Sequence, residues 1–210
     1  MSRYIGPVCR LCRREGIKLM LKGPRCETAK CPMEKQWRSN PPGMHAWRRG
    51  KGSGYAIRLR EKQKLKRYYG ILETQFLQYF SRAERSRGNT GEALLMLLER
   101  RLDNVVCKAG LAPSRKSARV MIHDGHIHVN GRRVDRPSFQ VGQGDVVSIK
   151  ASPRSQQTAK RFLETTQYRA PQPWLQVDAG KLEVTVAALP SREDVQIPVE
   201  ELLIVEMCSR

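Results

Sequence analysis

The chain has 210 residues, with 39 lysines and arginines against 20 aspartates and glutamates, and a formal net charge of +19. No apolar run approaches the length of about 18 residues that spans a bilayer, and the first residues resemble neither a signal peptide nor a transit peptide. These features argue against a membrane-spanning helix and predict a soluble, intracellular protein.

The surplus charge is concentrated at the N-terminal end. Residues 1–70 carry 19 basic and 4 acidic side chains, residues 71–170 carry 17 and 9, and residues 171–210 carry 3 and 7. A solvated basic surface and a membrane-surface helix are alternatives, but the basic stretches lack a strong apolar face. A charge of this size favours nucleic acid as the partner. The acidic C-terminal segment is expected to contact protein.

Four of the six cysteines form a candidate metal site. Cys9, Cys12, Cys26 and Cys31 have the spacing C-x2-C-x13-C-x4-C. Thiolates at such spacing suit tetrahedral zinc, and four of them leave no open coordination position for catalysis. We therefore predict one structural zinc ion, with two disulfides, an iron–sulfur cluster or unrelated thiols as alternatives. The surrounding arginines and lysines are expected to favour the thiolate forms.

A basic segment and a basic helix follow the cysteines. Residues 32–54 are rich in proline, glycine and basic side chains, and we expect them to lie extended and to become ordered against a partner. A helix is predicted from Tyr55 to Tyr69, ending at Gly70. Its basic side chains cover most of its circumference, so contact with phosphates would support it, and an ordinary solvated helix is the alternative.

The middle of the chain predicts a second long helix. Its N-terminal signal is the capping-box pattern of residues 89–92, and its C-terminal signal is Gly110. Glu99, Arg100, Arg101 and Asp103 are expected to lie off its buried stripe. The apolar residues of that stripe are Leu94, Leu98, Leu102, Val105 and Ala109.

Another helix and a hairpin come next. Ser114 can cap a helix from residue 115 to about residue 123, and Asn130-Gly131 is a strong hairpin signal. The pattern predicts a helix–turn–helix followed by a small antiparallel sheet. His126 and His128 are expected to stack on or hydrogen-bond to unpaired RNA bases, because no carboxylate or nucleophile accompanies them in a catalytic pattern.

The C-terminal part predicts further elements. Residues 151–170 have a helical pattern, Trp174-Leu175 and the alternating residues 182–186 indicate short strands, and residues 202–205 form a final apolar element.

At this point the sequence resembles a known family almost from end to end. The similar segments are residues 4–16, 59–64, 98–106, 114–119, 125–131, 137–138, 144–145, 173–175, 192–194 and 209–210. The chain is identified as similar to the bacterial small-subunit ribosomal protein four family, in its zinc-binding variety.

The resemblance implies a structural, non-catalytic protein of the cytoplasmic small ribosomal subunit. It implies primary binding of ribosomal RNA at a five-prime domain junction, nucleation of assembly of the subunit body, and a contribution to translational accuracy. It further implies contact with ribosomal protein five and other small-subunit proteins, and a place near messenger RNA at the entry channel. The alternative is an RNA-modifying enzyme that uses residues 98–150 for docking, as pseudouridine synthases do, but the chain has no room for the catalytic domain.

The predicted fold class is α+β, with a zinc-bound N-terminal arm, a mainly helical domain, and an inserted helix-turn-helix module with a small antiparallel sheet. The expected parts are the arm and linker (1–50), the helical RNA-binding domain (51–97, completed by 160–210), the RNA-binding module (98–150) and a C-terminal return (151–210). The candidate RNA-binding residues are Arg10, Arg13, Arg14, Arg48, Arg49, Lys51, Arg58, Arg60, Lys62, Lys64, Arg67, Arg101, Arg115, Lys116, Arg119, His126, His128, Asn130, Arg132 and Arg133.

Overall fold

The computed structural model describes residues 4–44, 52–167 and 172–209, which divide into two compact units. Met1–Leu94 and Gln196–Arg210 form unit 1, and Leu95–Val195 form unit 2. Of the C-terminal segment 160–210, therefore, the last fifteen residues join the helical unit and the preceding part belongs to unit 2. Within the described ranges, no helix has the length and apolar character needed to cross a membrane.

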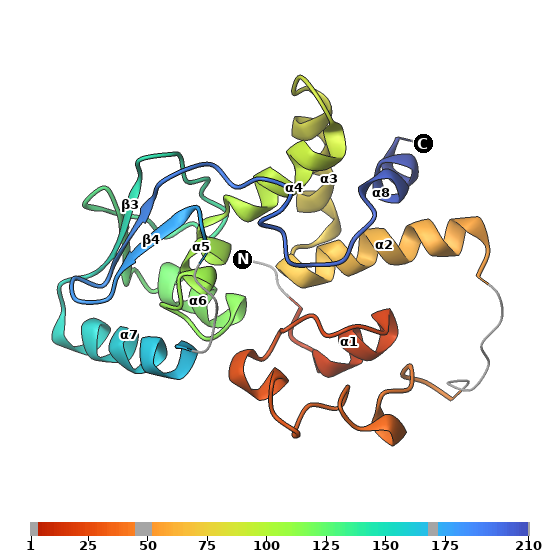
Figure 1. Cartoon of the computed structure of the whole chain (residues 1–210), viewed down its shortest axis with the longest axis horizontal. Helices are drawn as coiled ribbons and strands as arrows, with labels where there is room; N and C mark the ends of the chain where they lie inside the picture. The colour runs from red at the N-terminus through yellow and green to blue at the C-terminus, as the bar shows by residue number, and fades with distance from the viewer. Residues whose placement is uncertain (1–3, 45–51, 168–171, 210) are drawn as a thin grey trace. The chain divides into compact units, whose positions relative to one another are not determined.

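Unit 1 is helical. Its elements are α1 (Cys9–Glu15), η1 (Gly23–Cys26), η2 (Gln36–Arg38), α2 (Gly54–Tyr69), α3 (Glu73–Glu84), the first half of α4 (Thr90–Glu99) and α8 (Glu201–Cys208). Figure 1 shows α2 as the long central helix of this unit, and both α1 and α8 pack against it.

The predicted basic helix is confirmed as α2. The hydroxyl of Ser53 accepts a hydrogen bond from the Ala56 amide at 3.2 Å, which caps the helix at its first turn. Gly70 ends it with a φ of 63°, the left-handed conformation that glycine adopts without strain. Leu65, Tyr69 and Phe76 are fully buried and form part of the unit's core.

Unit 2 combines helices with one antiparallel sheet. The helices are α5 (Leu102–Lys108), α6 (Arg115–His123) and α7 (Pro153–Thr166), and the strands are β1 (Ile127–Val129), β2 (Arg132–Arg133), β3 (Val146–Ile149), β4 (Leu175–Asp178) and β5 (Glu183–Val186). The strand order is β2-β1-β3-β5-β4, with every neighbouring pair antiparallel. The three helices gather against this sheet around one core (Figure 1).

The helix predicted to run to Gly110 is interrupted, so this prediction was wrong. Helix α4 ends at Glu99 and α5 begins at Leu102, while Arg101 between them is extended, with a φ of −66° and a ψ of 135°. Arg101 forms a bridge with Gln140, and the Leu102 amide donates to the Phe139 carbonyl at 2.9 Å. Hydrogen bonds to a distant loop replace those of a continuous helix at this point.

The hairpin between β1 and β2 is confirmed. Asn130 and Gly131 have φ angles of 51° and 76°, the paired positive values that a two-residue hairpin turn requires. His128 lies opposite Arg133 and Val129 opposite Arg132. The turn therefore places two arginines at the outer edge of the sheet.

Candidate nucleic-acid interface

The outer strand β2 exposes its two arginines. Arg132 and Arg133 are both exposed, and β2 is the edge strand of the sheet. If residue 125 had a side chain, its Cβ would lie 2.5 Å from Arg133 Nε. The Arg133 guanidinium therefore lies directly against the backbone of Gly125, two residues before β1 begins. Gly125 itself has a φ of 75°. A glycine at this position thus allows both the left-handed backbone and the close approach of the arginine.

Asn130 uses its side chain within the protein. Its amide nitrogen donates to Asp145 Oδ1 at 2.8 Å, and its Oδ1 accepts from the Val146 amide at 2.9 Å. These two bonds tie the hairpin turn to β3. The structure therefore shows that Asn130 holds the hairpin, and the RNA contact predicted for this exposed residue stays a prediction.

Helix α6 carries three of the predicted contacts in its first five residues. Ser114 caps it, because its hydroxyl accepts from the Ser117 amide at 3.2 Å. Lys116 is exposed, and Arg115 and Arg119 are partly exposed. Arg115 donates through Nε to Asn104 Oδ1 at 2.8 Å, and Arg119 donates through Nε to Asp103 Oδ2 at 2.6 Å. Both arginines are thus oriented by side chains of α5.

Asp103 is the centre of a buried charge network. Arg101 donates to both of its carboxylate oxygens, at 3.1 and 2.9 Å, while Arg119 reaches the second oxygen from α6. Burial by itself would raise the pKa of Asp103, but the Arg101 and Arg119 guanidiniums outweigh it and hold that pKa below its ordinary value. Arg101 is only 1% exposed. The structure thus shows it bonded to the carboxylate that orients Arg119, and the RNA contact predicted for Arg101 stays a prediction.

A second buried network positions Arg115. Asn104 donates to Glu99 Oε2 at 2.6 Å, and Lys108 forms an ion pair with the same oxygen at 2.9 Å. Glu99 and Asn104 are both 0% exposed. The sequence analysis placed Glu99 and Asp103 off the buried stripe, and this expectation was wrong because each charge is compensated by partners inside unit 2. The signal available in the sequence was the cluster of four charged residues between two apolar helices.

The basic side chains of α2 are paired inside unit 1. The sequence offers only Glu61 as a nearby counter-charge, but the fold brings Glu15, Glu73 and Glu206 to the helix. The ion pairs are Arg58–Glu206, Arg60–Glu15, Lys62–Glu73, Lys64–Glu61, Lys66–Glu73 and Arg67–Glu15. Lys62 is 8% exposed, so its ammonium is largely removed from the surface. The predicted phosphate contacts on α2 therefore have protein partners in this structure.

Glu15 connects the cysteine-bearing segment to α2. Its side chain is fully buried, and its Oε1 accepts from both Arg60 and Arg67. Burial raises the pKa of the Glu15 carboxyl, and the nearby Arg67 and Arg60 guanidiniums offset this only in part. Its Oε2 has no hydrogen-bond partner among the described residues. One buried carboxylate thus holds two arginines of α2 at the end of α1.

None of the four N-terminal cysteines, all of which the structure describes, forms a disulfide. Cys12, Cys26 and Cys31 are buried and Cys9 is half-buried. The Lys22 amide donates to Cys26 Sγ at 3.3 Å. In the part of the chain that the structure describes, no three His, Cys, Asp or Glu side chains are grouped as a metal site.

Burial raises the pKa of the Cys12 and Cys26 thiols, and the neighbouring cysteines raise it further. Backbone N–H groups lower it only in part. Desolvation thus outweighs the backbone donors at these two sulfurs. The expectation that nearby arginines and lysines favour the thiolate forms stays a prediction.

The remaining predicted contacts lie on and after the first helix. Arg10 and Arg14 are exposed on α1, and Arg13 is half-buried. The predictions for Arg48, Arg49 and Lys51 fall outside the described residues. His128 lies on β1 and His126 immediately precedes this strand, and both side chains are half-buried.

The sequence matches two families over consecutive ranges. Residues 3–99 match the family described as Ribosomal protein S4/S9 N-terminal domain, and residues 100–147 match the S4 domain. The boundary between the two ranges coincides with the interruption between α4 and α5. The second range contains the helix pair, the hairpin and the whole of the Asp103 network, whereas Glu99 of the second network is the last residue of the first range.

Full-length relatives share about half of the residues. A protein named small ribosomal subunit protein uS4 from Halothermothrix orenii is 55% identical over 210 residues, covering 100% of both chains. Proteins from Pelotomaculum thermopropionicum, named uS4, and Symbiobacterium thermophilum, named uS4A, are 52% and 53% identical with the same coverage. These names describe ribosomal proteins and not enzymes, which disfavours the RNA-modifying alternative.

Proposed function

Since the chain belongs to the family of small ribosomal subunit protein uS4, we propose that it is a structural, non-catalytic component of that subunit that binds ribosomal RNA. The observation that carries this proposal is the arrangement of basic side chains in unit 2. Arg132 and Arg133 project from an edge strand, and Arg115 and Arg119 are oriented by buried partners. Arginines presented by rigid elements are suited to phosphate contacts, which supply most of the affinity for nucleic acid.

We propose further that Cys9, Cys12, Cys26 and Cys31 hold one zinc ion. Four free thiols within 23 residues supply the soft donor set that structural zinc takes, and backbone N–H groups donate to two of the sulfurs. A bound divalent cation would compensate the buried thiolates and supply folding free energy to the segment from Cys9 to Cys31.

The finer placement rests on the family resemblance. We propose binding at a five-prime domain junction of the small-subunit RNA, a role in nucleating assembly of the subunit body, and an influence on translational accuracy. Ribosomal protein five of the small subunit and messenger RNA near the entry channel are the proposed neighbours. The acidic C-terminal segment, with 7 acidic and 3 basic side chains over residues 171–210, is suited to a basic protein neighbour.

RNA binding is tested by titrating the full chain against small-subunit ribosomal RNA at several salt concentrations. Replacing Arg132 and Arg133 by alanine is expected to weaken binding and to lower the salt slope by roughly two, one for each phosphate that is no longer neutralised. The matched control replaces Arg85 and Arg87, which are exposed in unit 1 and outside the predicted set. Equal slopes for the two double variants would refute the hairpin contact, and no binding by the unaltered chain would refute the function.

Metal analysis of the purified chain tests the zinc proposal. We expect one zinc ion per chain, and we expect Cys9→Ser to lower this content and to make the N-terminal segment sensitive to proteases. Cys208→Ser is the control, because Cys208 is a half-buried thiol far along the sequence from the quartet. Unaltered metal content and protease resistance in Cys9→Ser would contradict the assignment.

A further inference from the structure

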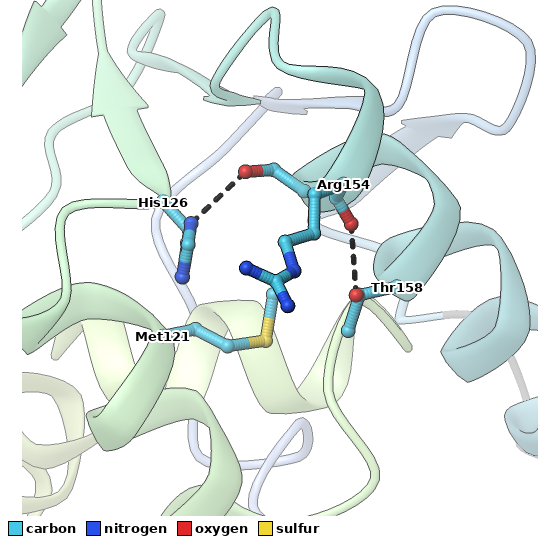
Figure 2. Close-up of a pocket in the computed structure, with 5 residues that line it drawn as sticks. Met121, His126, Arg154 and Thr158 are labelled. Carbon is cyan, nitrogen blue, oxygen red and sulfur yellow. Dashed lines mark hydrogen bonds between the residues drawn. The ribbon is translucent and has the colours of Figure 1, made fainter.

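Unit 2 contains a small pocket that the phosphate contacts above do not use. It has a volume of about 280 Å³ and is lined by Met121, His126, Arg154, Ser155 and Thr158. Three elements meet there, namely the end of α6, the residue that leads into β1 and the first turns of α7. Figure 2 shows the His126 ring, the Arg154 guanidinium and the Met121 sulfur directed toward one another.

The imidazole at this pocket is fixed in place. His126 Nδ1 lies 2.9 Å from the Ser155 hydroxyl, and Ser155 is only 4% exposed. The backbone of His126 is also bound on both sides, since its amide donates to the Met121 carbonyl at 2.9 Å and its carbonyl accepts from the Lys150 amide at 2.8 Å. Because a hydroxyl can donate to Nδ1, Nε2 can carry the ring proton and present a donor to the pocket.

The guanidinium at this pocket has unused donors. Arg154 is exposed, and only its backbone carbonyl is bonded, by the Thr158 hydroxyl at 2.9 Å. No hydrogen bond to its guanidinium is formed by the residues that the structure describes. Met121, at 6% exposed, adds an apolar contact to the lining of the pocket. The pocket thus joins an apolar contact to hydrogen-bond donors.

This combination matches one chemical class of ligand. Pockets for complete small ligands generally start near 300 Å³, so a pocket of about 280 Å³ suits a single flat group more than a larger cofactor. Unstacked RNA bases bind by stacking on imidazole or guanidinium planes and by hydrogen bonds along their edges. Arginine pairs best with an edge that offers two acceptors, as guanine does.

We propose that this pocket receives one unstacked base of the bound RNA, with Arg154 and His126 donating to acceptors on its edge and Met121 against its face. This inference rests on the proposed RNA-binding function and adds a contact that reads a base in addition to contacts that neutralise phosphate. Arg154 is not among the RNA-binding residues predicted from the sequence, and the proposal gives it a direct contact with a base.

The test compares Arg154→Ala with Lys160→Ala in the full chain bound to small-subunit ribosomal RNA. Both side chains are exposed on α7, and Lys160 does not line the pocket. The measurements are affinity, salt slope, and reactivity of each nucleotide toward reagents that modify base edges. We expect Arg154→Ala to weaken binding by roughly 10-fold and to make one protected base reactive. Lys160→Ala is expected to leave that base protected and to weaken binding less.

Three outcomes would overturn the proposal. Identical footprints and affinities for the two variants would mean that Arg154 makes no contact. A salt slope lowered by about one, with unchanged base protection, would mean that Arg154 contacts a phosphate. A wild-type chain that protects no nucleotide would overturn the proposed function and this inference together, whereas the first two results leave RNA binding intact.

Discussion

Asp103→Asn is expected to destabilise unit 2 by about 3 kcal/mol, near the lower end of the cost of removing one partner from a buried ion pair. The asparagine keeps one acceptor oxygen but removes the negative charge that Arg101 and Arg119 share. Arg101 is 1% exposed and would remain charged without a counter-ion. The loss of unfolding free energy therefore comes mainly from the buried Arg101 guanidinium that is left without a counter-ion, and less from the hydrogen bonds that are removed.

The assay is urea unfolding of unit 2 followed by the fluorescence of Trp174. That indole is 2% exposed in the core of this unit, and the other two tryptophans, Trp37 and Trp47, would be replaced by phenylalanine. With a urea dependence of about 2 kcal/mol per molar, a loss of about 3 kcal/mol lowers the midpoint by about 1.5 M. Asp135→Asn makes the same chemical change at an exposed position and is expected to shift the midpoint by less than about 0.3 M.

The pH dependence supplies an independent check on the same residue. Because the pKa of Asp103 is held below its unfolded value, its contribution is complete above about pH 4 and is lost as the pH falls through the folded pKa. The difference between wild type and Asp103→Asn should therefore shrink toward zero in acid. Equal midpoints for Asp103→Asn and Asp135→Asn at neutral pH, or a difference that grows in acid, would refute the reasoning.

Two other predictions concern the glycines and the cysteines. Gly125→Ala and Gly131→Ala impose the same backbone strain, with φ near 75° at both sites and a cost of about 1 kcal/mol, but only the first Cβ meets Arg133. Thermal unfolding should show similar losses for both variants, and only Gly125→Ala should also weaken RNA binding; equal affinities would refute the placement of Arg133. Zinc affinity, measured by competition with a chelator, should fall as pH is lowered, by about tenfold per unit for each proton displaced, because burial raises the pKa of Cys12 and Cys26; a flat profile would contradict thiolate coordination.

The elements that the sequence predicts correctly are those specified by neighbouring residues. The Ser53 and Ser114 caps, the Gly70 stop and the Asn130-Gly131 turn each depend on contacts within a few residues. The break at Arg101 does not, because it depends on hydrogen bonds to Pro137 and Phe139 carbonyls nearly forty residues away. Apolar spacing continues across the break, so periodicity alone cannot reveal it.

In the candidate site, too, the features set by neighbouring residues could be predicted and those set by distant contacts could not. Exposed arginines on a hairpin follow from local pattern, and the structure places Arg132 and Arg133 as expected. The buried partners of Arg115 and Arg119 could not be predicted, because a charged residue between two apolar helices is normally assigned to the surface. Only the fold shows that Glu99 pairs with Lys108, and Asp103 with Arg119, inside unit 2.

The pairing on α2 changes how its charge should be counted. From residue 58 to residue 67 the sequence has six basic side chains and one acidic one, a local net of +5. The fold adds Glu15, Glu73 and Glu206, so six basic side chains face four carboxylates and the described cluster carries only +2. Truncating Lys62 would leave Glu73, a carboxylate that repels phosphate, paired with Lys66 alone, so a loss of affinity there could not be assigned to one contact. The hairpin arginines carry no such ambiguity, since β2 is exposed and Arg133 lies against a glycine backbone. The proposed phosphate contacts are therefore best tested in unit 2, even though the sequence concentrates its charge in the N-terminal third.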